Sequence, residues 1–452
     1  MVKKLANKKF EDIDNQILRS FSFPSFFYIM LIALCNLLVL GGLIGFGVQW
    51  ALGMGTNGLN IPVGWAMHIA NYVFWIAVAM SGTFISAMLF LFRTDWRSVI
   101  NRVAETMTIF GIAVAGLFPI IHLGRNWVFF WVLPYPNWRH LWPNFKSPLV
   151  WDVLAIITYF TISVLIFYLG LLPDIAAIRD KVPKGWRKSA YKLLSLGWTG
   201  RYEQWREYTR AYLVLAVLGM PIAMSVHSVV AFDFSMSLLP GWHSTFYAPY
   251  FVAGAINSGL ATIVSLLIPL RKTLHLEKIF LPRYFQQMAM LMVLMGWILG
   301  YYYGEESFMD WYSGNIFIRQ FSVYRGMGSG YYSSIFWITI VCVVFVPMTF
   351  LFKKLRTNLR YLFVAAIFVN LGMWLERYML VITPLTHGYL PTQWGIYVPH
   401  APESLITGMA IGMFLGLFLI FIKIFPSVAV NDVKKLAQEH LEVQHEDRTG
   451  QG

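Results

Sequence analysis

The strongest constraint in this sequence is a series of long apolar runs, each long enough to cross a lipid bilayer. A membrane-spanning helix needs about 20 consecutive apolar residues. We predict ten such helices, at residues 26–52, 62–92, 103–133, 148–178, 207–233, 245–270, 283–303, 332–352, 360–382 and 403–425. Charged residues make up only 13% of the chain, whereas the surface of a soluble protein needs about a quarter. The sequence therefore predicts an all-α integral membrane protein.

Lys and Arg residues gather in alternate loops, and this pattern predicts the orientation of the helices, because positively charged loops stay on the cytoplasmic side. With the N-terminus inside, the other side holds six of the 35 basic residues, namely Arg125, Arg139, Lys146, Arg319, Arg325 and Arg377. We predict a cytoplasmic N-terminal segment (1–25), a polytopic membrane domain (26–425) and a cytoplasmic tail (426–452). No cleavable signal peptide is expected at the start. The net charge of +13 then reflects inner loops and not binding to nucleic acid.

Ionisable side chains inside the apolar runs are candidates for function, because a charge within a bilayer is costly. In the predicted orientation nearly all lie toward the outer helix ends, namely His68, His122, Arg125, Asp152, His227, Asp233, Glu376, Arg377 and Glu403. His122 and Asp152 fall at similar depth on consecutive helices. A carboxylate beside an imidazole suits that ring to take a proton from a hydroxyl group. The hydroxyl compound natural to a membrane is a quinol, so we predict an outer proton-handling site. The alternative is that each residue only satisfies a neighbouring helix or the interface.

Two acids fall on the inner side of the predicted bundle. Glu105 lies early in the third span, where it could begin a proton path from the cytoplasm. Asp174 follows Pro173 near the end of the fourth span, so a helix-terminal role is the alternative for this residue.

Haem, clusters and metals are not expected in this chain. Cys35 and Cys342 are too few for a thiolate site, which needs about four ligands. The membrane histidines all lie toward the outer side, whereas a two-haem bundle needs axial pairs at two levels. One haem between two outer histidines stays open as an alternative. The glycine-rich run at 326–330 lacks the Lys-Ser/Thr of a phosphate-binding loop.

The outer loops are unusually rich in Pro, Gly, Trp and Tyr, at residues 134–147, 234–244, 304–331 and 383–402. Such loops are expected to be ordered. We predict that they form a docking face for an external partner. The alternative is that they merely pack on each other.

Several stretches carry a resemblance to a known family. Residues 118–125 (FPIIHLGR) and 133–137 (LPYPN) resemble the NrfD/PsrC family of quinone-interacting membrane subunits. Residues 143–152, 170–174, 225–234 and 240–245 are similar to one branch of it, the ActC subunit of alternative complex III, with the paralogue ActF as the alternative. One departure is residues 80–82 (MSG), where that branch would have His-Ala-Gly.

The resemblance implies a fold of two four-helix bundles with flanking helices in a bacterial inner membrane. It implies menaquinol or another quinol as substrate, and no redox centre in this chain. Electrons would pass to a periplasmic iron–sulfur subunit and a multihaem cytochrome c subunit, beside further membrane subunits that include a paralogue.

The resemblance also assigns roles to individual residues. His122 and Asp152 would be the catalytic partners of the quinol hydroxyls. Asp233 and Arg377 would line the same pocket. From their positions in the spans we also predict Arg125 and His227 at the pocket, and Glu105, Asp174 and Glu376 on a proton path. The rival functions are a quinone-reducing anchor of a polysulfide- or nitrite-type reductase, a non-catalytic anchor and a secondary transporter. A transporter would place its charges near the midplane on interrupted helices.

Overall fold

The computed structural model describes residues 25–434, apart from 93, 95, 134–139, 141, 143, 278, 329, 431 and 432. Within these residues the chain forms helices and no strands. The spanning helices are α2 (Phe26–Leu52), α3 (Met67–Leu91), α4 (Arg97–Ala115) with α5 (Leu117–His122), α6 (Pro148–Lys181), α8 (Tyr202–Ser235), α9 (Tyr247–Thr273), α10 (Pro282–Tyr312), α12 (Tyr331–Ile340), α15 (Leu359–Thr386) and α16 (Ala401–Ile424). The described part holds nine spans that are long and apolar enough to cross a membrane, and α10 supplies the tenth predicted span.

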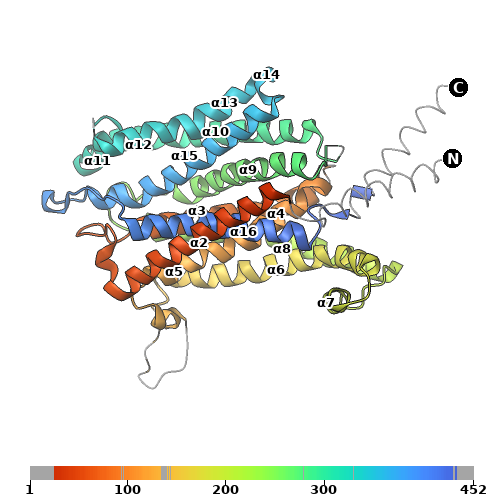
Figure 1. Cartoon of the computed structure of the whole chain (residues 1–452). Coiled ribbons are helices and arrows are strands. Elements are labelled where there is room, and N and C mark those ends of the chain that lie inside the picture. The colour runs from red at the N-terminus through yellow and green to blue at the C-terminus, as the bar shows by residue number, and fades with distance from the viewer. Residues whose placement is uncertain are drawn as a thin grey trace.

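The spanning helices form two four-helix bundles, as predicted (Figure 1). The N-terminal bundle consists of α3, α4, α6 and α8. The C-terminal bundle consists of α9, α10, α12 and α15, where α12 continues through the π-helical turn η3 (Val341–Phe345), α13 (Val346–Met348) and the 3₁₀ turn η4 (Thr349–Leu351). Helices α3 and α9 join the two bundles, and α2 and α16 pair beside them.

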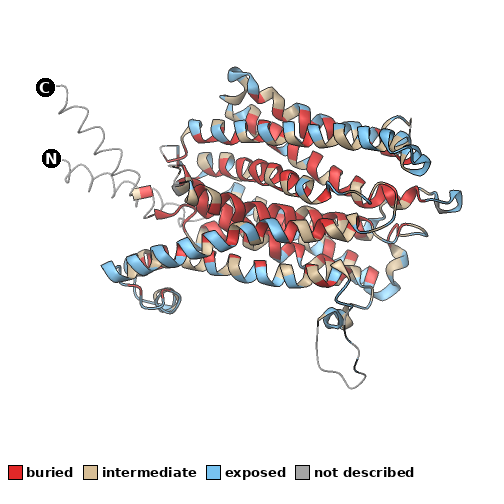
Figure 2. Ribbon diagram, turned by 180° about the vertical axis from the view of Figure 1, so that it is seen from behind, coloured by how far each residue is buried: buried red, intermediate tan, exposed pale blue. Residues whose placement is uncertain are grey.

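Burial separates the helices that hold the core from those with exposed faces (Figure 2). In α3, 83% of the most apolar window is buried, against 17% in α2. The α2–α16 contact depends on small residues, because a Cβ at Gly42 would lie only 2.1 Å from Met409 Cβ. Close backbone approach of this kind is the usual means of packing helices inside a membrane.

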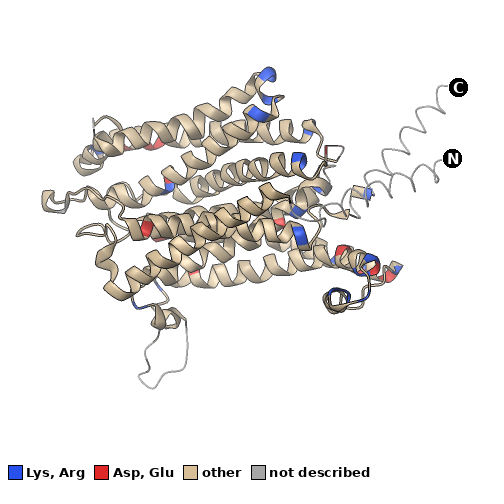
Figure 3. Ribbon diagram, in the orientation of Figure 1, with Lys and Arg blue, Asp and Glu red and all other residues tan. Residues whose placement is uncertain are grey.

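The two described chain ends lie at the same end of the bundle. Helices α2 and α16 run antiparallel, and the Tyr28 hydroxyl donates a hydrogen bond to the Leu419 carbonyl at 2.7 Å. Lys and Arg residues gather at this end of the bundle (Figure 3). We call this end inner and the opposite end outer. The cytoplasmic location of the termini remains a prediction, and residues 1–24 and 435–452 lie outside the described residues.

The third span ends earlier than the sequence predicts. Helix α4 breaks at Gly116, α5 ends at His122, and Gly124 then adopts the left-handed φ of 66°. A 3₁₀ segment, η2 (Asn126–Val132), follows in place of further spanning helix. Its Trp127 and Trp131 side chains are exposed. The apolar run predicted at 103–133 therefore contains a span and an outer apolar turn with exposed aromatic side chains.

Two short helices lie at opposite ends of the structure. Helix α7 (Trp186–Leu194) follows α6 at the inner end. Its Trp186 and Leu193 side chains are exposed and lie beside basic residues of the same helix. Helix α11 (Ile316–Gly326) lies at the outer end between α10 and α12, and its Asn315 side chain caps its first turn. Neither short helix was distinguished from loop in the sequence.

Candidate functional site

Five polar side chains from four helical segments come together at the outer end of the N-terminal bundle, and we call them the outer cluster: His68, Tyr72, His122, Asp152 and Asp233. The His122 ring ends α5 and lies 6.2 Å from the His68 ring, centroid to centroid, in an edge-on arrangement. Tyr72 lies one helical turn beyond His68 on α3, so both side chains share one face. The Tyr72 hydroxyl donates a hydrogen bond to Asp152 Oδ2 on α6.

The outer cluster leaves several buried polar atoms without a hydrogen-bond partner among the described residues. They are His68 Nε2, His122 Nδ1, Asp152 Oδ1 and Asp233 Oδ1. Buried polar atoms without partners are rare in proteins, and each one in a native structure requires an explanation. Imidazole nitrogens can donate or accept, and carboxylate oxygens accept. The open positions therefore match a small molecule that carries hydroxyl or carbonyl groups.

Asp233 on α8 adds a second carboxylate to the outer cluster. It interacts electrostatically with Asp152, and both carboxylates interact with Tyr72. Asp152 is 6% exposed, while Asp233 is half-buried. A proton bound by one carboxylate therefore changes the electrostatic surroundings of the other. Such a pair is suited to accept and pass on protons in succession.

His227 and Arg377 lie at the interface between the bundles. The Arg377 guanidinium lies 4.2 Å above the Phe251 ring, and the His227 ring lies 5.4 Å from the same ring. Both ring nitrogens of His227 lack hydrogen-bond partners among the described residues, and this side chain is fully buried. These two residues thus form a neighbouring element around Phe251. Arg125 is exposed on the outer surface beyond α5.

The structure changes the predicted partnership within the site. His122 Nδ1 and Asp152 Oδ1 remain open, and the hydrogen bond to Asp152 comes from Tyr72 instead. Sequence reasoning missed Tyr72, and it noted His68 only as an outer histidine. The sequence did contain a signal for both residues. His68 and Tyr72 are four positions apart on one predicted helix, and residues with this spacing lie on one face.

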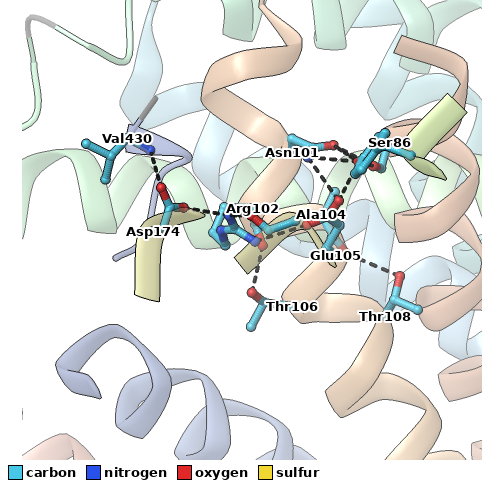
Figure 4. A network of polar contacts seen from close by, with 11 residues as sticks. Ser86, Asn101, Arg102, Ala104, Glu105, Thr106, Thr108, Asp174 and Val430 are labelled. Atoms are coloured by element: carbon cyan, nitrogen blue, oxygen red, sulfur yellow. Dashed lines mark hydrogen bonds and ion pairs between the residues drawn. The ribbon is translucent and has the colours of Figure 1, made fainter. Parts of the chain in front are cut away.

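A second polar network lies at the inner end, and we call it the inner network (Figure 4). Arg102 on α4 is 1% exposed; its guanidinium lies 3.2 Å from Glu105 and 2.6 Å from Asp174. Glu105 also accepts hydrogen bonds from Asn101 at 3.0 Å and from Tyr212 at 2.6 Å. The predicted third span begins at residue 103 and leaves Arg102 just outside it, but the structure buries Arg102 inside the bundle. Its charge explains why two acids are tolerated there.

Asp174 also has a structural role, in agreement with the alternative noted from the sequence. Its Oδ1 accepts a hydrogen bond from the backbone N–H of Val430 at 3.2 Å, which fixes the segment after α16 to α6. Gly170 allows the close approach of Glu105, because a Cβ there would lie 3.1 Å from Glu105 Oε2. The predicted proton-path residues Glu105 and Asp174 thus meet in one network, whereas Glu376 lies in the other bundle.

The described outer loops pack on each other and also expose apolar side chains. The His387 ring stacks between Tyr324 and Trp394, with ring centroids 4.3 and 4.1 Å away, and burial lowers the pKa of this histidine. The same loops leave Ile396 63% and Val398 60% exposed. The alternative that these loops pack on each other is therefore confirmed for the described residues, and the docking face for an external partner stays a prediction. The predicted docking face also includes the loop 134–147. Of this loop, residues 134–139, 141 and 143, with Arg139 among them, lie outside the described residues.

Metal binding finds no support in the described residues, which contain no group of three or more His, Cys, Asp or Glu side chains that could hold an ion. Cys35 and Cys342 are buried free thiols. The absence of haem and iron–sulfur clusters from the chain stays a prediction.

Comparison with known proteins identifies the family. A family model described as polysulphide reductase, NrfD, matches residues 55–387, so the chain belongs to the NrfD family of membrane proteins. The matched region contains the outer cluster and most of both bundles. The chain is also similar to a putative dimethyl sulfoxide reductase membrane subunit from Halobacterium salinarum, with 28% identity over 231 residues. That match covers 50% of this chain and 48% of the relative, so the chain spans about half the length of that protein.

Proposed function

We propose that this protein is the quinone-interacting membrane subunit of a respiratory oxidoreductase complex and that it oxidises quinol at the outer cluster. The observation that carries the proposal is the outer cluster itself, where imidazoles and carboxylates from different helices converge with unpartnered atoms. A quinol offers two hydroxyl groups on a flat ring. Hydroxyl donors fit the open carboxylate oxygen of Asp152 and the open nitrogen of His122.

The proposed chemistry separates protons from electrons. Oxidation of one quinol to quinone releases two protons and two electrons. His122 Nδ1 accepts one hydroxyl proton and Asp152 Oδ1 the other, and Tyr72 holds the Asp152 carboxylate in place through its hydrogen bond. Asp233 takes over a proton from the pair and releases it outward. The two electrons leave to an iron–sulfur or haem group of a partner subunit outside this chain.

The partner and the complex are part of the proposal. We propose that the exposed apolar outer loops bind a periplasmic iron–sulfur subunit, with a multihaem cytochrome c subunit beyond it, as in alternative complex III. A bacterial inner membrane and a paralogous membrane subunit belong to the same proposal. The apolar side chains Ile396 and Val398 support it, because exposed apolar patches outside the bilayer mark interaction sites.

The second candidate is the same site working in reverse, as the quinone-reducing subunit of a reductase. The descriptions of the family model and of the relative both name reductases, and this favours the candidate. In that direction the outer cluster donates protons to quinone oxygens. Measuring which redox form of the quinone supports turnover in the purified complex separates the two directions.

A proton supply from the inner side is a further part of the proposal. Between the inner network and the outer cluster, hydroxyl groups form hydrogen bonds at the middle of the N-terminal bundle. Thr83 Oγ1 lies 3.2 Å from both Thr108 and Ser163, and the Tyr159 hydroxyl lies 3.1 Å from Thr83. Hydroxyl groups can both donate and accept, so this segment supports a path from Glu105 and Asp174 toward Asp152.

The test is substitution of Asp152 by Asn in the assembled complex. This change keeps the size of the side chain and removes its capacity to accept a proton, so we expect menadiol oxidation to fall by about a hundredfold or more. Assembly is checked by co-purification of the partner subunits. The control is Asp180→Asn, which alters the exposed inner end of the same helix, where Asp180 is 66% exposed. Wild-type menadiol turnover in the assembled Asp152→Asn complex would overturn the proposal.

A further inference from the structure

A cavity with several polar side chains in its walls lies at the outer end of the C-terminal bundle, apart from the outer cluster. It lies among α9, α10, α11, α12 and α15 and contains about 50 Å³ of space that water-sized molecules can occupy. This is room for about three or four water molecules. The polar side chains that line it are Tyr250, Tyr303, Glu306, Arg325 and Glu376. Cavities with several polar walls hold water, whereas apolar ones stay dry.

Glu376 is the most deeply placed acid of this cavity. The side chain is 4% exposed, and its Oε1 accepts hydrogen bonds from the Tyr250 hydroxyl and, at 3.2 Å, from Arg377. Its Oε2 lies 3.1 Å from the Arg377 guanidinium but has no hydrogen-bond partner among the described residues. This oxygen keeps its ion pair with Arg377 and can still accept a hydrogen bond from a water molecule or bind a proton.

A chain of hydroxyl groups connects Glu376 with the outer side. The Tyr250 hydroxyl, which donates to Glu376, lies 2.9 Å from the Tyr303 hydroxyl. Beyond Tyr303 the cavity reaches Glu306, which pairs with Arg325 at 3.0 Å. The Glu306 side chain is 24% exposed, so this end of the chain contacts the surroundings of the protein.

The same arrangement occurs in both bundles. In the N-terminal bundle, Tyr72 near the outer start of α3 donates to Asp152. In the C-terminal bundle, Tyr250 near the outer start of α9 donates to Glu376 on α15. Each bundle thus carries one buried carboxylate that a tyrosine from its first helix holds. The proposed function uses only the first of these pairs.

We propose that Glu376 is a second proton-binding site and that it exchanges protons with the outer side through the water-filled cavity and Tyr303. A hydronium ion in the cavity gives its proton to Glu376 Oε2, and a water molecule remains. Arg377 compensates the charge of Glu376 in the deprotonated state.

The charged and titratable groups around Glu376 come from α8, α9, α10, α11 and α15. They are Arg377 on α15, Tyr250 on α9, Tyr303 and Glu306 on α10, Arg325 on α11 and, across Phe251, His227 on α8.

The site would give the C-terminal bundle a role in proton release. Its use during turnover rests on the proposed function, because the quinol supplies the protons. Proton exchange between Glu376 and outer water does not rest on it. The two statements can therefore fail separately.

The test is infrared difference spectroscopy of the purified complex during a pH titration in H₂O and D₂O. We expect a carboxyl C=O band that shifts in D₂O and is absent from the Glu376→Gln variant. In the Tyr303→Phe variant the Glu376 carboxyl remains. The exchange of its proton for deuterium, followed as the shift of its C=O band, should be severalfold slower than in the wild type. The matched control is Tyr301→Phe, which changes a tyrosine that is 67% exposed on the same helix and should exchange at the wild-type rate.

Two results would overturn the inference. The first is a carboxyl band set that is identical in wild type and Glu376→Gln. The second is an equal exchange rate in Tyr303→Phe and wild type, which remains informative if Glu376→Gln fails to assemble. Loss of quinol chemistry alone, with the exchange of the Glu376 band intact, would contradict the proposed function and leave this site standing.

Discussion

Replacing Arg102 by Met tests whether the inner network is held together by its buried cation. Methionine is unbranched and apolar and replaces the aliphatic stem of arginine, so the change removes the guanidinium and its charge while the stem is kept. In the wild-type protein Arg102 compensates Glu105 and Asp174, each of which is 2% exposed. Removing one partner of a buried ion pair costs about 3–5 kcal/mol. Because two carboxylates lose their cation here, we expect a value toward the upper end of that range.

The readout is the thermal unfolding midpoint of the purified complex in detergent. A change of several kcal/mol corresponds to a fall of roughly 10 °C in this midpoint for a domain of moderate size. Arg206→Met is the control, because Arg206 pairs with Glu207 at an exposed position and exposed pairs contribute about 0–1 kcal/mol. Its midpoint should stay close to that of the wild type.

A triple variant separates the loss of charge balance from a loss of packing. Arg102→Met combined with Glu105→Gln and Asp174→Asn removes all three charges together. Since replacement of a complete buried ionic group by neutral residues is often neutral for stability, the triple variant should recover most of the lost midpoint. A wild-type midpoint in Arg102→Met, or a triple variant as unstable as the single one, would refute the reasoning.

Two further substitutions test the outer cluster and the helix packing. Tyr72→Phe removes a charge-assisted hydrogen bond to Asp152, worth about 1.5–3 kcal/mol. If that bond is needed in the transition state, kcat/KM for menadiol falls roughly 10- to 100-fold. The control Tyr28→Phe loses only a hydrogen bond to the Leu419 carbonyl on the inner side and should change kcat/KM little. Equal losses in both variants would show that any hydrogen-bonded tyrosine matters as much. Gly42→Ala forces a Cβ to 2.1 Å from Met409 Cβ and should lower the unfolding midpoint, while Gly47→Ala meets nothing within 4 Å and should leave it unchanged.

The helices were predictable because the bilayer imposes one length and one polarity on each span. The prediction for α2 agrees with the structure at both ends. The third span shows a limit of hydropathy, which predicts a longer helix than the structure contains. Its apolar residues continue past His122, but Gly124 turns the chain. The apolar side chains of η2 then lie exposed at the outer end of the bundle. Hydropathy alone does not distinguish a spanning helix from an apolar turn that follows it.

The candidate site was only partly predictable. Hydropathy and loop charge placed His122, Asp152 and Asp233 at one end of the bundle, because helix direction fixes the depth of each residue. The rotation of a helix about its axis decides which side chains meet, and in a bundle this depends on the packing of all neighbours. Tyr72 was therefore missed as the partner of Asp152. Arg102 was misjudged for a related reason, since a basic residue near a helix end can point inward as well as toward the cytoplasm.

The most direct test of the central claim is photolabelling of the intact complex with an aryl-azide derivative of a quinone, followed by mass spectrometry of the labelled peptides. The account predicts labels at the outer ends of α3, α5 and α6, near His68, His122 and Asp152. Excess menadiol should suppress these labels, and Asp152→Asn should weaken them. Labels confined to other parts of the chain, or equal labelling of the outer cluster in the presence of excess menadiol, would contradict the account.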